Sequence, residues 1–179
     1  MSLSPTTLAL RQQLLPEPGQ SLYCILDGAS VDGLLDKLFQ LDPAHVCLYR
    51  GKLEPDLAET APYLVQLDLG SEFATWVIED GWGKHWGIFA HSEADLEAVR
   101  RHFRRFLMVR GPDGKQLYFR YYDPRVLRVF LPTCDEEQTQ TLFGPIETYL
   151  LEADEADRVV RFRRADGVVR EEVAALPQR

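Results

Sequence analysis

The sequence predicts an α/β protein with a central mixed sheet, helices packed on it and a C-terminal hairpin. Short apolar runs typical of buried strands alternate with stretches whose apolar residues recur at helical spacing. Near the C-terminus, the turn dipeptide Asp166-Gly167 separates two charged, strand-like runs. A chain of 179 residues fits one domain. It can bury about two-thirds of its unfolded surface, so it needs no disulfide or metal staple.

The first half of the chain alternates between predicted helices and strands. Ser4 and Pro5 suit the N-cap and first position of a short helix, which Pro16 to Gly19 ends. Apolar residues at helical spacing predict further helices over 34–41, 54–61 and 72–80. Short apolar runs predict strands over 21–27, 46–49, 63–69 and 86–90.

The second half opens with the best-specified helix, predicted over 92–107. Ser92 is its expected N-cap, and Glu93 and Asp95 suit its positive first turn. The turn Gly111-Pro112-Asp113-Gly114 predicts a hairpin between 107–109 and 116–122. Further helices are expected over 124–131 and from Asp135 to just before Gly144. Strands are expected over 146–151, 159–162 and 168–173, the last two forming an edge hairpin.

The composition indicates a reducing compartment and a soluble chain. Cys24, Cys47 and Cys134 are odd in number and contain no CxxC pair, which argues against a disulfide framework and a zinc site. The start of the chain lacks the features of a signal peptide, and no apolar stretch approaches a membrane span. The formal charge of −8 opposes binding to nucleic acid or anionic membranes. We therefore expect a cytoplasmic protein.

Catalytic and cofactor motifs are absent from the sequence. It has no GxSxG, HExxH, P-loop or GxGxxG pattern. The glycine-rich run 81–87 is better explained as a tight turn pinned by Trp82 and Trp86 than as a phosphate loop. His85 and His91 flank a predicted strand about 20 Å apart, too far to share a metal ion, and are expected to be loop histidines. His102 lies among arginines, which disfavour its protonated form. We expect no catalytic residue, metal or cofactor.

The charges are distributed unevenly along the chain. Residues 53–83 contain seven acids and no Lys or Arg, whereas residues 98–128 contain nine bases and two acids. Four of these bases lie on one flank of the predicted helix over 92–107: Arg100, Arg101, Arg104 and Arg105. They form either a docking surface for an acidic protein or one half of an internal pairing between the two segments. Both interpretations stay open.

Several motifs together resemble one bacterial family. They are LYCILDGA (22–29), LYRG (48–51), APYLVQL (61–67), WGKHWGIF (82–89), FRYYDPRVLRVFLP (119–132) and FGPIETYLLE (143–152). The combination resembles the type VI secretion adaptor/chaperone family, also called Tap or TEC and catalogued as domain of unknown function 4123. The resemblance covers about residues 22–152. It implies a dedicated chaperone that holds a toxic effector and helps load it onto a VgrG-type spike. The chain then divides into an N-terminal helix and linker (1–20), an adaptor domain (21–152) and a charged hairpin extension (153–179).

The motif at 119–132 has a physical interpretation of its own. Asp123 and Pro124 suit the N-cap and first turn of a short helix. Arg125 and Arg128 would project from it three residues apart, in position to meet one carboxylate. Tyr121 and Tyr122 would face opposite sides of the preceding strand, one buried and one available. Alternatively, Asp123 and Arg125 only fasten the loop to the scaffold. The expected partner-binding residues are Arg100, Arg101, Arg104, Arg105, Arg120, Tyr122, Asp123, Arg125 and Arg128.

Three functions are consistent with these observations. The first is a non-enzymatic adaptor for a type VI effector, with the VgrG-type spike as a second partner. The second is a small α/β hydrolase-like enzyme, which needs a pocket joining Asp27, His85 or Cys24 to another titratable group. The third is an immunity protein that neutralises a toxin by binding it.

Overall fold

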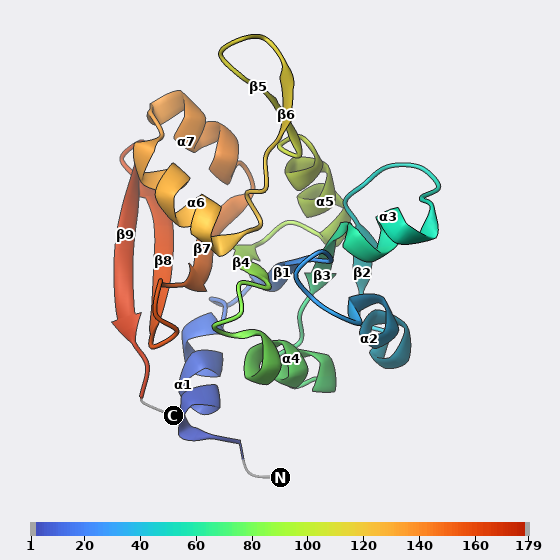
Figure 1. Ribbon diagram of the computed structural model, residues 1–179. Coiled ribbons are helices and arrows are strands. Elements are labelled where there is room, and N and C mark those ends of the chain that lie inside the picture. The colour runs from blue at the N-terminus through green and yellow to red at the C-terminus, as the bar shows by residue number, and fades with distance from the viewer. Residues whose placement is uncertain (1–2, 178–179) are drawn as a thin grey trace.

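The computed structural model describes residues 3–177 and confirms the α/β fold class (Figure 1). A seven-stranded sheet has the order β2-β3-β1-β4-β7-β8-β9, and β5 and β6 form a separate two-stranded sheet. The strands are β1 (Ser21–Asp27), β2 (His45–Cys47), β3 (Pro62–Gln66), β4 (Gly87–Ser92), β5 (Met108–Arg110), β6 (Gln116–Tyr118), β7 (Ile146–Glu152), β8 (Arg158–Ala165) and β9 (Val168–Ala175). The α-helices are α1 (Pro5–Leu14), α2 (Leu34–Leu41), α3 (Pro55–Thr60), α4 (Glu72–Trp76), α5 (Leu96–Arg104), α6 (Pro124–Phe130) and α7 (Glu136–Phe143). A π-helical turn (Val77–Gly81) extends α4, and a 3-10 turn (Leu131–Thr133) extends α6.

The direction of the strands differs from the predicted mixed sheet. Every strand pair within residues 3–177 is antiparallel. The strands β1 and β2 do run in the same direction, and α2 connects them. However, β3 inserts between them and pairs with both, so the parallel neighbours that the alternation of strands and helices suggested never meet.

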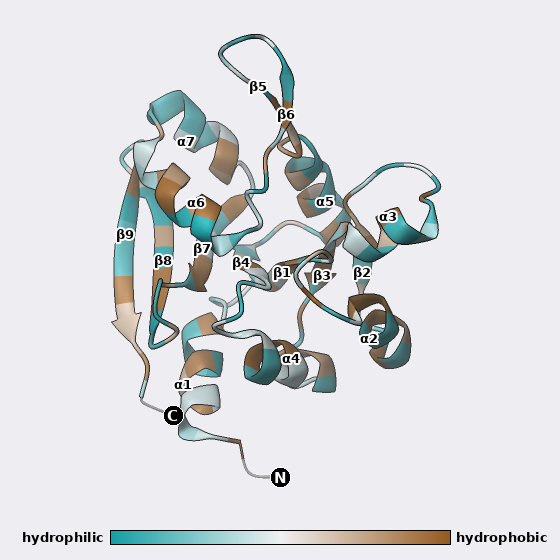
Figure 2. Cartoon of the chain, in the orientation of Figure 1, coloured by the Kyte–Doolittle hydropathy of each residue, from teal (hydrophilic) through white to brown (hydrophobic). Residues whose placement is uncertain are grey.

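The main sheet separates two hydrophobic cores, one on each face. Along β1, Tyr23 and Ile25 point into one core, while Leu22, Cys24 and Leu26 point into the other. Helices α5, α6 and α7 cover the first face, and α1, α2 and α4 cover the second (Figure 1). In Figure 2 hydrophobic residues line the inner sides of these layers, whereas the exposed turns of α7 are hydrophilic. Because both faces are covered, β1 is apolar along nearly its whole length.

Helix α5 is shorter than the predicted helix over 92–107. Its N-cap is Asp95, whose carboxylate accepts a hydrogen bond from the backbone N–H of Ala98. Ser92 is instead the last residue of β4, and its hydroxyl donates to the backbone oxygen of Pro145. The prediction that Ser92 is the N-cap was wrong, because Ser92 belongs to strand β4 and Asp95, three residues later, caps the helix.

The two hairpins lie in different environments. The hairpin β5–β6 projects from the α5–α7 side of the molecule, away from the main sheet (Figure 1). The C-terminal hairpin instead continues the sheet, because β8 pairs with β7 and β9 forms the outer edge, as expected for a charged strand. Within residues 3–177, no helix combines the length and the apolar character needed to cross a membrane.

Candidate protein-binding surface

Buried carboxylates fasten the loops at the C-terminal end of β1. Asp27 is almost fully buried and accepts hydrogen bonds from the backbone N–H of Ala29, the hydroxyl of Ser30 and the guanidinium of Arg120. Glu152, at the end of β7, accepts from the backbone N–H groups of Gly83 and His85. Asp27 therefore joins the motif 22–29 to the motif 119–132, and Glu152 joins the motif 143–152 to the motif 82–89.

The motif around Asp123 forms a cap and two separate ion pairs. Asp123 accepts the backbone N–H of Arg125 at 2.9 Å and its guanidinium at 2.7 Å. Burial raises the pKa of Asp123, but the bonds from Arg125 outweigh this effect and hold the pKa below its usual value. Arg128 pairs with Asp154 and donates to the backbone oxygen of Glu152. The two arginines therefore meet different carboxylates, and the expected shared carboxylate was wrong.

Tyr122 is not available to a partner. Strand β6 ends at Tyr118, so Tyr121 and Tyr122 lie in the turn before α6 and not on a strand. Both side chains are buried, Tyr121 stacking on Phe103 with the ring centroids 5.6 Å apart. The expectation that one ring is free was wrong because the alternation of a strand does not extend to a turn.

The arginines of α5 have different tasks. Arg104 donates to the backbone oxygens of Cys47, Leu48 and Tyr49 and so fastens the end of β2. Arg105 donates to Nδ1 of His102, and Arg100 pairs with Glu97. Arg101 is well exposed, with only a distant contact to Glu97. Among the expected binding arginines, Arg101 and Arg105 thus face solvent, as do parts of Arg120 and Arg125.

The residues of the enzyme hypothesis have separate partners. Cys24 is fully buried in the core beneath α1, α2 and α4, and burial raises the pKa of its thiol far above the usual range. Asp27 pairs with Arg120, whereas His85 pairs with Glu152. The hydrogen bonds of Asp27 and His85 hold loops in place, and Cys24 lies apart from both in the core.

Two further histidines, His91 and His102, are buried hydrogen-bonding residues. His91 lies in β4, not in a loop as expected, and its Nε2 bonds to the backbone oxygen of Leu14. His102 bonds through Nε2 to the backbone oxygen of Leu142. Its pKa is lowered to about 4, chiefly by burial, with Arg105 as a further cause. The run 81–87 is the expected tight turn: the indole N–H of Trp82 donates to the backbone oxygen of Ala156, and Trp86 packs over Gly81.

The acidic and basic segments do not neutralise each other. Within residues 3–177, none of the ion pairs joins residues 53–83 to residues 98–128. The basic segment pairs with nearby acids such as Glu97, Asp113 and Asp123, or with Asp27 and Asp154. The acids of 53–83 form no ion pair in the described part of the chain. Direct internal pairing is therefore the wrong interpretation of the uneven charge.

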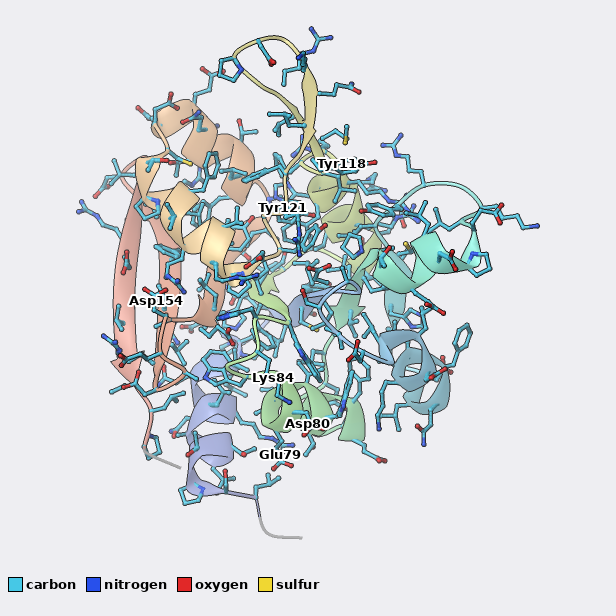
Figure 3. The ribbon with its side chains drawn as sticks, viewed as in Figure 1. Glu79, Asp80, Lys84, Tyr118, Tyr121 and Asp154 are labelled. Atoms are coloured by element: carbon cyan, nitrogen blue, oxygen red, sulfur yellow. The ribbon has the colours of Figure 1, made fainter. Side chains whose placement is uncertain are left out.

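The hairpin β5–β6 exposes apolar side chains on both faces. Met108 lies opposite Tyr118, and Val109 lies opposite Leu117, so each cross-strand pair occupies one face. All four side chains are exposed, Tyr118 at 71% and Leu117 at 49%. In Figure 3 Tyr118 lies where the hairpin meets the body of the protein, and the buried Tyr121 lies nearer the centre. Two strands alone are marginally stable in water, so such a hairpin gains stability when a partner covers it.

A groove borders each face of the hairpin. The first, which we call the cationic groove, has a volume of about 410 Å³ and lies between Met108 and Tyr118 on one side and Leu53 and Leu57 on the other. Its only charged lining residues are Arg50 and Arg104.

The second groove, the aromatic groove, has a volume of about 240 Å³. Val109 lines it together with Phe106, Phe119 and Phe130, and α7 closes its far side. Phe119 and Phe130 meet edge to face with centroids 4.8 Å apart, which fixes their positions. The hairpin and these two grooves form the hairpin surface.

Sequence reasoning predicted this hairpin but not its exposure. The signal was present, because two consecutive apolar residues stand on each strand, in LMVR and QLYF. A strand with apolar residues on both faces is either buried on both faces in the core or exposed where a binding partner can cover it.

The fold and this surface define an α/β protein with an exposed, partly apolar docking region. A comparison with protein families finds that the family described as "Domain of unknown function (DUF4123)" matches residues 22–141. The chain belongs to this family, as its motifs predicted. Comparisons with curated proteins and with solved structures found no significant match.

Proposed function

We propose that this chain is a non-enzymatic adaptor that binds a toxic type VI secretion effector and helps load it onto a VgrG-type spike. Membership of the family and the hairpin surface support this proposal. The observation that carries it is the hairpin β5–β6, whose apolar faces are exposed between the cationic groove and the aromatic groove. Exposed, contiguous apolar surface of this kind marks protein-binding sites.

The chemistry of the hairpin surface specifies the kind of effector segment that it holds. Tyr118 and the phenyl rings of the aromatic groove are anchors for apolar side chains, because large aromatic groups dominate interface energies. Arg50 lines the cationic groove, and Arg110 and Lys115 flank the hairpin turn. The bound segment would therefore be apolar and bear carboxylates at the cationic groove and the hairpin turn, but none at the aromatic groove, whose lining includes Glu137. These charges would set its register and association rate.

Co-expression with the large neighbouring open reading frames tests the proposal. Affinity purification and mass spectrometry should recover one toxin-like protein in a stable complex. The double variant Leu117→Ser, Tyr118→Ser should weaken that complex about 30-fold or more, because truncating a central anchor typically costs about 2 kcal/mol. Phe39→Ser is the matched control, since Phe39 on α2 is 80% exposed but lies outside the hairpin surface.

The contrary results are distinct. If the protein is recovered alone and the candidate toxin is soluble and abundant without it, the adaptor function is wrong. If the complex forms but the hairpin variant binds as tightly as the Phe39 variant, the effector binds outside the hairpin surface. The adaptor function would then still hold. Requirement in the donor cell, and not in the recipient, separates an adaptor from an immunity protein.

A further inference from the structure

A third groove, of about 660 Å³, lies at the end of the sheet opposite the cationic groove. Its walls come from the start of β1, the residues before β2, the residues after β3 and the segment after α1. Strands β1 and β2 run in the same direction, because each is antiparallel to β3. The start of β1 and the cationic groove, which follows the end of β2, therefore lie at opposite ends of these strands.

The lining of this groove is apolar and negatively charged. Leu15, which is 64% exposed, lies there with Leu41, Leu69 and Phe73. The charged lining residues are Asp42 and Asp68, both exposed, and no Lys, Arg or His is among them. We call it the acidic groove.

The two carboxylates have no cationic partner in the described part of the chain. Asp68 uses Oδ1 to accept the backbone N–H of Gly70 at 2.8 Å. Asp42 ends α2 in a left-handed conformation, with φ of 44°, and forms no ion pair within residues 3–177. Gln20 also lines the groove, and its Oε1 is buried without a hydrogen-bond partner among those residues. The groove therefore presents hydrogen-bond acceptors that lack a partner among the described residues, and its lining contains no positively charged side chain.

Asp68 belongs to the acid-only segment 53–83, which continues into α4. The seven acids of this segment form no ion pair within residues 3–177, although three of them, Glu54, Asp56 and Glu59, lie at α3 beside the cationic groove. Glu72, between the lining residues Ser71 and Phe73, adds negative charge near the groove, whereas Glu79 and Asp80 lie on the turn that extends α4 (Figure 3). A field that internal pairs do not cancel steers a partner of opposite charge to the surface.

We propose that the acidic groove binds a segment of a partner protein that carries arginine or lysine beside leucine-like side chains. The apolar lining would take the aliphatic side chains, and Asp42 and Asp68 would each meet a cation at the rim. A small-molecule site would need buried, convergent polar groups, whereas both carboxylates here are exposed. The protein thus has two docking surfaces of opposite charge at opposite ends of its sheet.

Synthetic peptides provide a direct test with the full-length protein. The probe is a short fluorescein-labelled peptide in which leucine and arginine alternate, and its control has glutamate in place of arginine. Fluorescence anisotropy should show binding of the arginine peptide that weakens with added salt, and no binding of the glutamate peptide. No binding of the arginine peptide, or equal binding of both peptides, would overturn the proposal.

Charge-removing variants assign the binding to the groove. The double variant Asp42→Asn, Asp68→Asn keeps the backbone conformation and the hydrogen bond to Gly70, because asparagine tolerates left-handed φ and retains an acceptor. It should bind the arginine peptide about tenfold more weakly. The control Asp166→Asn, Glu171→Gln removes the same charge from the C-terminal hairpin and should leave binding unchanged. An equal loss in both variants would show attraction to net charge alone and overturn the proposal.

Two other occupants would give different results. The hairpin β5–β6 carries Arg110 and Lys115 beside apolar residues, so a second copy of the chain has matching chemistry. Self-association that is lost in the Asp42, Asp68 variant would assign the groove to that copy and overturn the proposal. If free arginine displaces the peptide at a concentration similar to that of the peptide, the groove binds a small cation, and the proposal is overturned. The Leu117, Tyr118 variant should bind the peptide normally, so a failure here is distinguishable from a failure of the adaptor function.

Discussion

His102 makes the stability of this protein depend on pH. It is buried between α5 and α7, Arg105 donates to its Nδ1, and its Nε2 bonds to the backbone oxygen of Leu142. Its pKa is lowered from 6.5 to about 4, so the folded protein keeps it neutral where the unfolded chain already takes up a proton. Stability is therefore full above pH 6.5 and falls as the pH drops towards 4. Between pH 7.5 and 5, these two pKa values predict a loss of about 2 kcal/mol from His102 alone.

Urea denaturation at pH 7.5 and pH 5 measures this loss. The variant His102→Gln has no ionisable group there, so its free energy of unfolding should change with pH by about 2 kcal/mol less than that of the wild type. Burial also lowers the pKa of His91, in the same direction, but His91 is present in both proteins and cancels in the comparison. Equal pH dependence in the two proteins would refute the reasoning.

Three further predictions concern packing, capping and reactivity. Gly87→Ala should cost more than about 3 kcal/mol or prevent folding, because its Cβ would lie 1.9 Å from the backbone oxygen of Ile25, whereas Gly70→Ala should be mild; soluble yield and urea denaturation report both. Asp135→Ala removes the capping box of α7 and should cost about 1 kcal/mol, seen as a melting temperature about 2–4 °C lower; an unchanged value would contradict the cap. Cys24 should react with a thiol reagent only after unfolding, because burial raises its pKa and removes it from solvent; modification in the native state would contradict this burial.

Local features of the sequence determined most of the individual elements. Ser4, Asp123 and Asp135 were each expected at the start of a helix, and each caps one through its side chain. The apolar run Ser21 to Asp27 was expected as a strand and has the bounds of β1. These predictions succeeded because caps and periodicity depend on residues within about four positions of one another.

The tertiary structure decided how those elements meet. Strand β3 lies between β1 and β2 and is antiparallel to both, so β1 and β2 are not neighbours. The guanidinium of Arg104 binds three backbone oxygens and is not free for a partner. The tertiary structure also buries Tyr122 and leaves Tyr118 exposed. Such outcomes depend on which distant segments become neighbours, and no local pattern contains that information.

The sequence by itself determined the family, the helices and strands, and the uneven distribution of charge. Only the tertiary structure decided that the acidic and basic segments form no ion pair with each other within residues 3–177, because the paired bases contact nearby acids or Asp27 and Asp154. The acids of residues 53–83 therefore have no ion-pair partner within residues 3–177, and the apolar side chains of the hairpin are exposed to solvent. Both features follow from three-dimensional proximity, since charge pairing and burial are properties of contacts and not of position along the chain.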